Sequence, residues 1–122
     1  MSDARTYLEV VQRLREIGLM DDHALLAETT QLFLGDAARM VVAMREGQAK
    51  GDANAVGRAA HRLKGAALNL GAAAVAAPAR EIEERTRRGD RSDVANLIAT
   101  IESEVRCVGD FLRDLAKAGA PL

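Results

Sequence analysis

Hydrophobic residues recur at helical spacing along the last third of the chain for about seven turns, the longest apolar seam in the sequence. The seam consists of Val94, Leu97, Ile98, Ile101, Val105, Val108, Leu112 and Leu115. A helix with such a seam must pack it against other elements to remove it from water. Aromatic residues make up only 2% of the chain, and β-sheets favour branched and aromatic side chains, so the other elements are expected to be helices. The sequence therefore predicts an all-α fold.

Four further helices are expected before this seam, because stretches of helical spacing alternate with short breaks. They cover about residues 4–17, 22–50, 53–70 and 72–88. Connections this short make neighbouring helices antiparallel. We expect a single domain of residues 1–122 that forms an antiparallel up-down four-helix bundle with an additional short N-terminal helix. The core of the bundle would cover about residues 22–117, and the N-terminal helix, within residues 1–20, would act as a lid.

The same spacing predicts which side of each helix faces the core. In the first helix the inward residues are Tyr7, Val10 or Val11, Leu14 and Ile17. In the second helix they are Leu25, Thr29, Leu32, Phe33, Asp36, Met40, Ala43 and Met44, although the polar Asp36 breaks the pattern. In the third they are Val56, Ala60, Leu63, Ala67 and Leu70, and in the fourth Val75, Ala79, Ile82 and Thr86. Together with the last seam, these faces would form one core.

Helix starts are marked by polar residues and by one proline. Asp21 or Asp22 can cap the second helix and Ser92 the last, because their side chains accept hydrogen bonds from the first free amides. The third helix is expected to open at Asp52 or Ala53. Pro78 conflicts with a helix interior, since proline lacks an amide hydrogen and crowds the carbonyl four residues earlier. We expect the fourth helix to start late or to hold Pro78 in its first turn, rather than to kink there.

The chain carries 17 basic and 18 acidic residues, so its net charge of −1 does not favour nucleic acid or an anionic membrane as a partner. A basic cluster comprises Arg85, Arg87, Arg88 and Arg91, but interleaved acidic residues favour a solvated helix end. The single cysteine, Cys107, is expected to be a buried thiol in a reducing compartment. Residues 1–5 lack an apolar signal core, and no stretch approaches membrane-spanning length. We expect a cytoplasmic monomer.

His61 lies inside the third expected helix with a glycine four residues away on either side, Gly57 and Gly65. Residues four apart are neighbours on one helix face, so these glycines leave the imidazole uncovered. A glycine inside a helix costs about 1 kcal/mol relative to alanine, so two of them around one histidine indicate a functional requirement. Helical projection places Lys64 and Leu68 on the same flank, beside the core stripe. The pattern predicts a histidine that a bulky partner can reach.

The neighbours of His61 favour phosphoryl chemistry. A neutral imidazole keeps a free lone pair on one ring nitrogen and can act as a nucleophile. Lys64, one turn further along, can place its ammonium beside an anionic group on the ring. Glu83 on the following helix can accept a proton from the other ring nitrogen and orient the imidazole. Alternatively, Glu83 only pairs with Arg87, four residues on, as part of a solvated face.

Residues 60–72, with the sequence AHRLKGAALNLGA, resemble the signature of the histidine-containing phosphotransfer (HPt) domain, the four-helix module of multistep two-component phosphorelays. The resemblance extends over about residues 25–115. It implies that His61 accepts a phosphoryl group and that Lys64 stabilises it. It also implies that Gly65 keeps the site open and that Gly71 serves the interhelical turn. The family often places a Gln or Glu against the imidazole, and Glu83 falls at that spacing.

The resemblance implies a carrier without autonomous kinase activity. It would accept a phosphoryl group from a receiver-domain phosphoaspartate and pass it to another receiver aspartate. The implied partners are receiver domains of a hybrid sensor kinase or of response regulators, which would supply Mg²⁺, while this chain would bind no cofactor or metal. The surface expected to dock them comprises Gly57, Arg58, Arg62, Gly65 and Leu68. Ala66 and Ala67 depart from the family, because many members carry small hydroxyl residues there.

Other interpretations are weighed against the carrier. A helical-bundle adaptor that is never phosphorylated would need no uncovered histidine. The dimerising histidine domain of a sensor kinase normally has an acidic residue after its histidine, whereas Arg62 stands there. A metal site is disfavoured because His23 and His61, the only histidines, show no ligand spacing. The phosphoryl carrier is therefore the favoured hypothesis and the adaptor its alternative.

Overall fold

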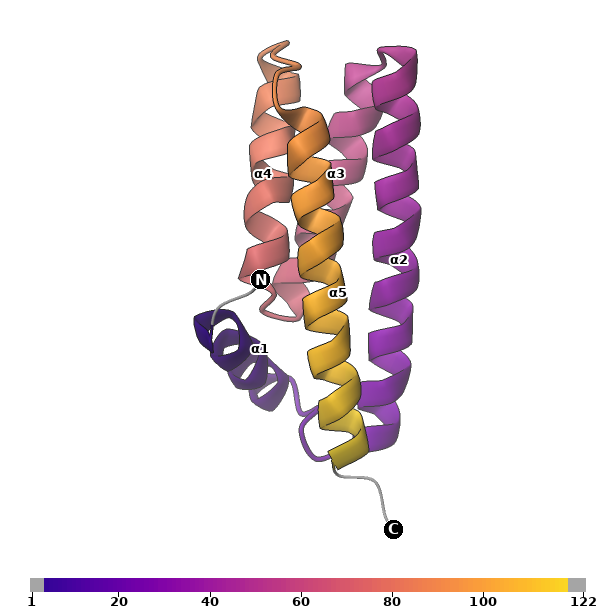
Figure 1. Ribbon diagram of the computed structural model, residues 1–122. Helices are drawn as coiled ribbons and strands as arrows, with labels where there is room; N and C mark the ends of the chain where they lie inside the picture. Colours follow the sequence, from indigo (N-terminus) through magenta and orange to yellow (C-terminus); the bar gives the residue numbers. More distant parts are fainter. Residues whose placement is uncertain (1–3, 119–122) are drawn as a thin grey trace.

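The computed structural model describes residues 4–118; the start of the segment 1–5 considered above and residues 119–122 lie outside the described residues. Five helices follow in order: α1 (Ala4–Glu16), α2 (His23–Lys50), α3 (Ala53–Asn69), α4 (Ala73–Arg87) and α5 (Val94–Ala118). Helices α2 to α5 run alternately up and down side by side, and α1 lies across the lower part of the bundle (Figure 1). The predicted all-α bundle with an additional N-terminal helix is confirmed. None of the helices within residues 4–118 combines the length and apolarity that crossing a bilayer requires.

Aspartates and glycines define the ends of the helices that carry the site. Asp22 and Asp52 are the N-caps of α2 and α3, where their carboxylates accept hydrogen bonds from the amides of Leu25 and Ala55 at 3.0 Å. Gly51 ends α2 with φ of 70°, a left-handed conformation that glycine adopts without steric cost. The predicted cap of α2 and the predicted start of α3 are confirmed.

The core runs along the whole bundle and receives one face from each long helix. Its largest fully buried side chains include Leu26, Met44, Leu63, Ile82, Ile98, Ile101 and Leu112. The stripe predicted for α3, from Val56 to Leu70, is buried at every position. Burying each large apolar side chain contributes about 1.5–3 kcal/mol, so this stripe fixes how α3 is rotated about its axis. Ile17, predicted to face inward, is exposed instead because α1 ends at Glu16.

The predicted inward face of α2 is wrong in part. Its buried residues are Leu26, Thr30, Phe33, Ala37, Val41, Met44 and Gly47. Leu25 and Leu32, assigned to the core, are exposed. Thr30 enters the core because its hydroxyl donates to the carbonyl of Leu26 at 2.8 Å, which satisfies its polarity within the helix. Asp36, which broke the predicted stripe, lies off the core and pairs with Arg39.

Pro78 lies in the second turn of α4, so the prediction of a late start or a first-turn proline is wrong. The helix starts earlier because the carbonyl of Ala72 accepts hydrogen bonds from the amides of Val75 and Ala76 at 3.1 and 3.0 Å. The amide that proline lacks would have reached the carbonyl of Ala74. Because α4 starts at Ala73, Glu83 lies well beyond the first turn of the helix.

The predicted cap of α5 is also wrong. Helix α5 begins at Val94, directly after Asp93, whose φ of 62° is left-handed. The carbonyl of Asp93 accepts a hydrogen bond from the amide of Leu97 at 3.0 Å. Asp93 is therefore the N-cap position of α5. Ser92 instead hydrogen-bonds the carboxylate of Asp90 through both its amide and its hydroxyl. The Ser92 hydroxyl therefore binds a carboxylate in the loop and does not accept a hydrogen bond from a helix amide.

Helix α1 packs over the turn between α3 and α4. The Nε of Arg13 donates to the carbonyl oxygen of Asn69 at 3.1 Å, and the ring of Tyr7 stacks on Phe111 of α5 with centroids 4.6 Å apart. Gly71 in the turn has φ of 70°, and a Cβ there would stand 2.7 Å from a backbone oxygen of α1. Only glycine allows both the turn and this close approach.

Candidate functional site

His61 lies near the middle of α3, on the flank beside the buried stripe. Its chain neighbour Ala60 and the nearby Leu63 are fully buried, so the packing of α3 turns the imidazole away from the core. The His61 side chain keeps 68% of its solvent exposure. A reactant as large as another protein can therefore reach the ring.

Glu83 of α4 lies against the imidazole of His61. Its Oε2 is 2.6 Å from Nδ1 of the ring, and the Glu83 side chain is only 13% exposed. An ionised carboxylate can only accept hydrogen bonds, so Nδ1 carries the hydrogen and donates it. In the neutral ring the free lone pair is then on Nε2. The contact between α3 and α4 thus determines which nitrogen of His61 keeps a free lone pair.

Two cationic side chains also lie close to Glu83. The Nζ of Lys64 donates to Oε1 at 2.6 Å, and the Lys64 side chain is 20% exposed. A guanidinium nitrogen of Arg87 lies 3.6 Å from Oε2, one helical turn along α4. Both pairings of Glu83 considered from the sequence, with His61 and with Arg87, therefore occur together. From the sequence, the ammonium of Lys64 was expected to pair with an anionic group on the ring. In the structure it is bound by the Glu83 carboxylate, which also binds the ring.

The hydrogen bond from Lys64 is the main cause that lowers the pKa of the Glu83 carboxyl below its usual value of 4.5. The hydrogen bond from His61 lowers the pKa further, whereas partial burial acts in the opposite direction. The carboxyl is therefore ionised at neutral pH. In that form it can hold the ammonium and the imidazole at the same time.

Acidification should remove the stabilisation that Glu83 provides. Because its pKa is lowered in the folded chain, the ionised group stabilises the fold above its usual value of 4.5, and this contribution is lost as the pH falls through the lower folded value. The free energy of unfolding of Glu83→Gln should therefore lie below that of the wild type near neutral pH. The two should converge well below pH 4.5. Urea denaturation across this pH range measures the difference.

Glu84→Gln is the matched control, because Glu84 is the next residue of α4 and is exposed. It should unfold like the wild type at every pH. If the deficit of Glu83→Gln were the same at neutral and acidic pH, the ionised carboxylate would not be the stabilising form.

The two glycines around His61 have different surroundings. A Cβ on Gly65 would meet nothing within 4 Å, so that side of the imidazole is open, as expected from the sequence. A Cβ on Gly57 would stand 2.8 Å from Oγ1 of Thr86, closer than real Cβ contacts. Gly57 therefore allows α4 to approach α3 rather than only clearing space around the ring. This close approach supports the placement of Glu83 opposite His61.

An open groove of about 430 Å³, called here the α3–α4 groove, adjoins His61 on the side of Gly57. Its lining consists of Ala53, Asn54, Gly57, Arg58 and His61 from α3 and Glu83, Thr86 and Arg87 from α4. Sequence reasoning missed Asn54, Thr86 and Arg87 as parts of the site. A signal existed for one of them, because Asn54, Arg58 and His61 recur at intervals of four and three along one helix face.

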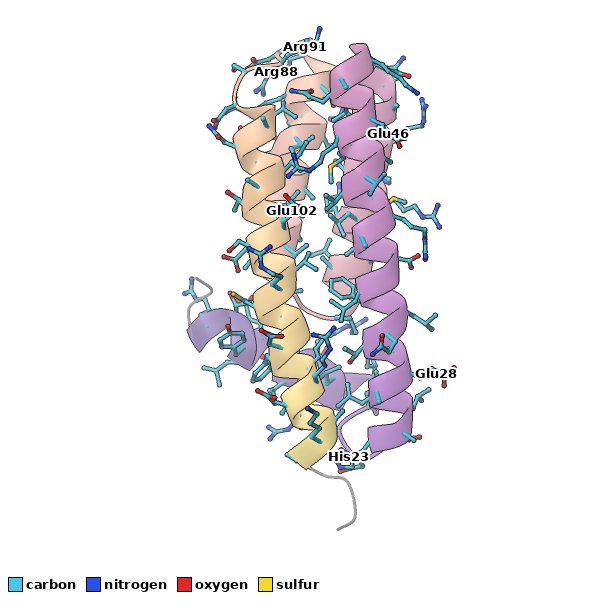
Figure 2. All side chains as sticks on the ribbon, turned by 45° about the vertical axis from the view of Figure 1, so that its right-hand side comes forward. His23, Glu28, Glu46, Arg88, Arg91 and Glu102 are labelled. Atoms are coloured by element: carbon cyan, nitrogen blue, oxygen red, sulfur yellow. The ribbon has the colours of Figure 1, made fainter. Side chains whose placement is uncertain are left out.

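The other residues expected at the docking surface are also accessible. Arg58 and Arg62 are exposed, and Leu68 is about half exposed at 45%. Two residues of the basic cluster lie apart from the site, since Figure 2 shows Arg88 and Arg91 at the upper end of the bundle, whereas Arg87 of the same cluster lines the α3–α4 groove. Within that cluster Arg85 is held by ion pairs with Glu81 and Asp90, in agreement with a solvated helix end.

Comparison with known proteins gives two matches. The family model described as "Hpt domain" matches residues 28–117. Among solved structures, the chain is similar to the crystal structure of histidine-containing phosphotransfer protein B (HptB) from Pseudomonas aeruginosa PAO1, with 27% sequence identity and a TM-score of 0.78. This similarity covers 97% of this chain and 96% of that chain. A search among curated protein sequences found no match.

Proposed function

The chain belongs to the Hpt domain family and is a phosphotransfer carrier of phosphorelays, and from this premise we propose that Nε2 of His61 is the atom that carries the phosphoryl group. The donor would be the phosphoaspartate of one receiver domain, and the acceptor the aspartate of another. One observation carries the proposal. The His61 side chain is 68% exposed, yet Nδ1 lies 2.6 Å from Oε2 of Glu83, which leaves Nε2 as the free nucleophile.

The transfer step follows from this arrangement. The lone pair on Nε2 attacks phosphorus in line with the bond to the aspartyl oxygen. The new P–N bond forms as the P–O bond breaks, and the aspartate leaves as a carboxylate. The imidazole becomes cationic, because Nδ1 keeps its hydrogen while Nε2 gains phosphorus. The ionised Glu83 faces this ring and stabilises the charge that develops on it.

Lys64 and Gly65 are assigned supporting roles. The Lys64 backbone lies one helical turn from His61, and its ammonium binds Glu83, the residue that also binds the ring. We assign to this ammonium the pairing with phosphoryl oxygens after transfer. Gly65 leaves the approach to the ring open, since nothing lies within 4 Å of the place a Cβ would take. Gly71 shapes the turn after α3.

Proteins of this family interact with receiver domains, and we assign the exposed flank around His61 to that contact. Arg58 and Arg62 attract an acidic phosphorylation pocket, and Leu68 offers an apolar contact. The receiver is expected to supply the Mg²⁺ that neutralises the phosphoryl oxygens during transfer. This chain supplies the nucleophile and the groups that orient it.

Incubation with a phosphorylated receiver domain tests this function. Radiolabelled phosphate should move from the receiver to this chain. The product should be labile in acid and stable in alkali, as phosphohistidine is, whereas alkali hydrolyses an acyl phosphate. A second receiver, added unlabelled and in excess, should then remove the label, because a carrier gives up what it accepts.

The expected product and its removal together define a carrier. If no receiver domain of the source organism labels the chain, the carrier role of His61 is contradicted. If a label appears but survives acid, another type of residue holds it.

A further inference from the structure

The α3–α4 groove has a positive rim that the transfer step does not use. Arg58 lines it from α3 and Arg87 from α4. Glu83 is the only acidic residue among its lining residues. That carboxylate already binds Lys64 and His61 at 2.6 Å. A guanidinium nitrogen of Arg87 also lies 3.6 Å from Glu83. A single carboxylate therefore faces three cationic side chains, Arg58, Arg87 and Lys64, and the groove keeps a net positive charge.

The position of the groove separates it from the reacting atom. Glu83 lines the groove and binds Nδ1, so the groove adjoins the Nδ1 edge of the ring. A phosphoryl group on Nε2 would project from the other edge. A group seated in the groove can therefore stay bound while the phosphoryl group is transferred.

The chemistry of the rim selects the class of ligand. Guanidinium groups bind carboxylates through paired N–H donors, and such bonds are strongest where water is partly excluded. The amide of Asn54 and the hydroxyl of Thr86 add polar partners inside the groove. A volume of about 430 Å³ holds an acidic side chain together with the residues beside it.

The groove also lies next to the surface that any phosphoryl donor must contact, because His61 lines it. On the other side of His61 along α3 lie the open Gly65 and the half-exposed Leu68. A docked partner would thus meet a cationic groove on one side of the imidazole and an apolar contact on the other. This asymmetry fixes the direction in which a partner can lie on α3.

We propose that the α3–α4 groove binds an aspartate or glutamate side chain from the rim of the receiver's phosphorylation pocket, and that this contact selects among receiver domains. The inference rests on the proposed function, since it takes the receiver as the occupant. Arg58 and Arg87 are the residues that determine specificity, whereas Arg62 contributes only long-range attraction. Receivers without an acidic residue at this place bind less tightly.

The test compares two arginines on one helix. Arg58→Gln removes a guanidinium from the groove, and Arg62→Gln removes the same charge one turn away, outside the groove lining. The measurements are KM and kcat for transfer from a phosphorylated receiver that labels the wild type. The dissociation constant of the complex between each variant and the same receiver, in its unphosphorylated form, is measured in parallel.

Arg58→Gln should raise KM and the dissociation constant about tenfold and change kcat less than about twofold. Arg62→Gln should raise them less than about threefold, and this smaller effect should vanish at high salt, where long-range attraction is screened. The effect of Arg58→Gln should persist at high salt because the contact is short-ranged. If both variants weakened binding equally and high salt abolished both effects, the proposal would be overturned.

A second variant fills the groove without changing its charge. Asn54 is exposed and lines the groove, so Asn54→Phe leaves the core intact and occupies the space. It should raise the dissociation constant as Arg58→Gln does; wild-type binding would overturn the proposal. Failure of the proposed function is recognised separately, because it would abolish labelling of the wild type, while the binding comparison still reports on the groove.

Discussion

The His61→Gln variant is expected to accept no phosphoryl group, with transfer reduced by about 1000-fold or more. A glutamine amide has no nucleophilic lone pair, yet its NH₂ group can still donate to Glu83. The fold should be retained, because the His61 side chain is 68% exposed and contributes little to the core. Transfer from a radiolabelled receiver and thermal denaturation of the same sample measure the two properties.

His23→Gln is the matched control, since it removes the other histidine of the chain. His23 is the first residue of α2 and lies at the lower end of the bundle in Figure 2. This variant should be labelled at the wild-type rate. Undiminished, acid-labile labelling of His61→Gln would contradict the assignment, because a residue other than His61 would then carry the phosphoryl group.

Gly65→Leu should separate stability from activity. Leucine favours a helix interior over glycine by up to about 1 kcal/mol, and a Cβ at this position meets nothing within 4 Å. Helical side chains lean toward the N-terminus of their helix, so a leucine here would cover the imidazole of His61, four residues earlier. We expect equal or higher stability and transfer slowed about 100-fold.

Urea denaturation and single-turnover transfer measure these opposite changes. Gly65→Ala is the control, because its methyl group is too short to cover the ring, and its transfer rate should stay within about threefold of the wild type. Unimpaired transfer in Gly65→Leu would contradict the need for open access. Gly57 is unsuitable for this test, since a Cβ there would stand 2.8 Å from Thr86 and disturb the helix contact.

The fold was largely predictable where one helix face alone is apolar. In α3 the stripe from Val56 to Leu70 has polar residues opposite it, and the structure buries every residue of the stripe. In α2 apolar residues occur on two faces, since Leu32 and Val42 are exposed while Phe33 is buried. Spacing cannot choose between such faces, because the choice depends on which side the neighbouring helices cover.

Errors at helix ends have a similar cause. Pro78 was expected to restrict where α4 starts, but the carbonyl of Ala72 already accepts the first amides before the proline is reached. Ser92 was expected to cap α5, but Asp90 binds it first. Local propensity describes what a residue can do, and competition among nearby partners decides what it does.

The candidate site likewise has features that the sequence predicted and features that it did not. The spacing of His61 from its two glycines indicated an exposed imidazole, which is a property of one helix. The partner of Lys64 was not predictable, because it depends on the register between α3 and α4. The contact of Gly57 with Thr86 lets these helices lie close together and brings Glu83 within 2.6 Å of both the ring and the ammonium.

The most direct test of the central claim is to locate the phosphorus on the imidazole ring. NMR of the phosphorylated protein, with isotope-labelled histidine, detects the coupling between phosphorus and the ring nitrogen bonded to it. Because Glu83 holds Nδ1, we predict coupling to Nε2 of His61. Coupling to Nδ1, or a phosphoryl group on any other residue, would contradict the account.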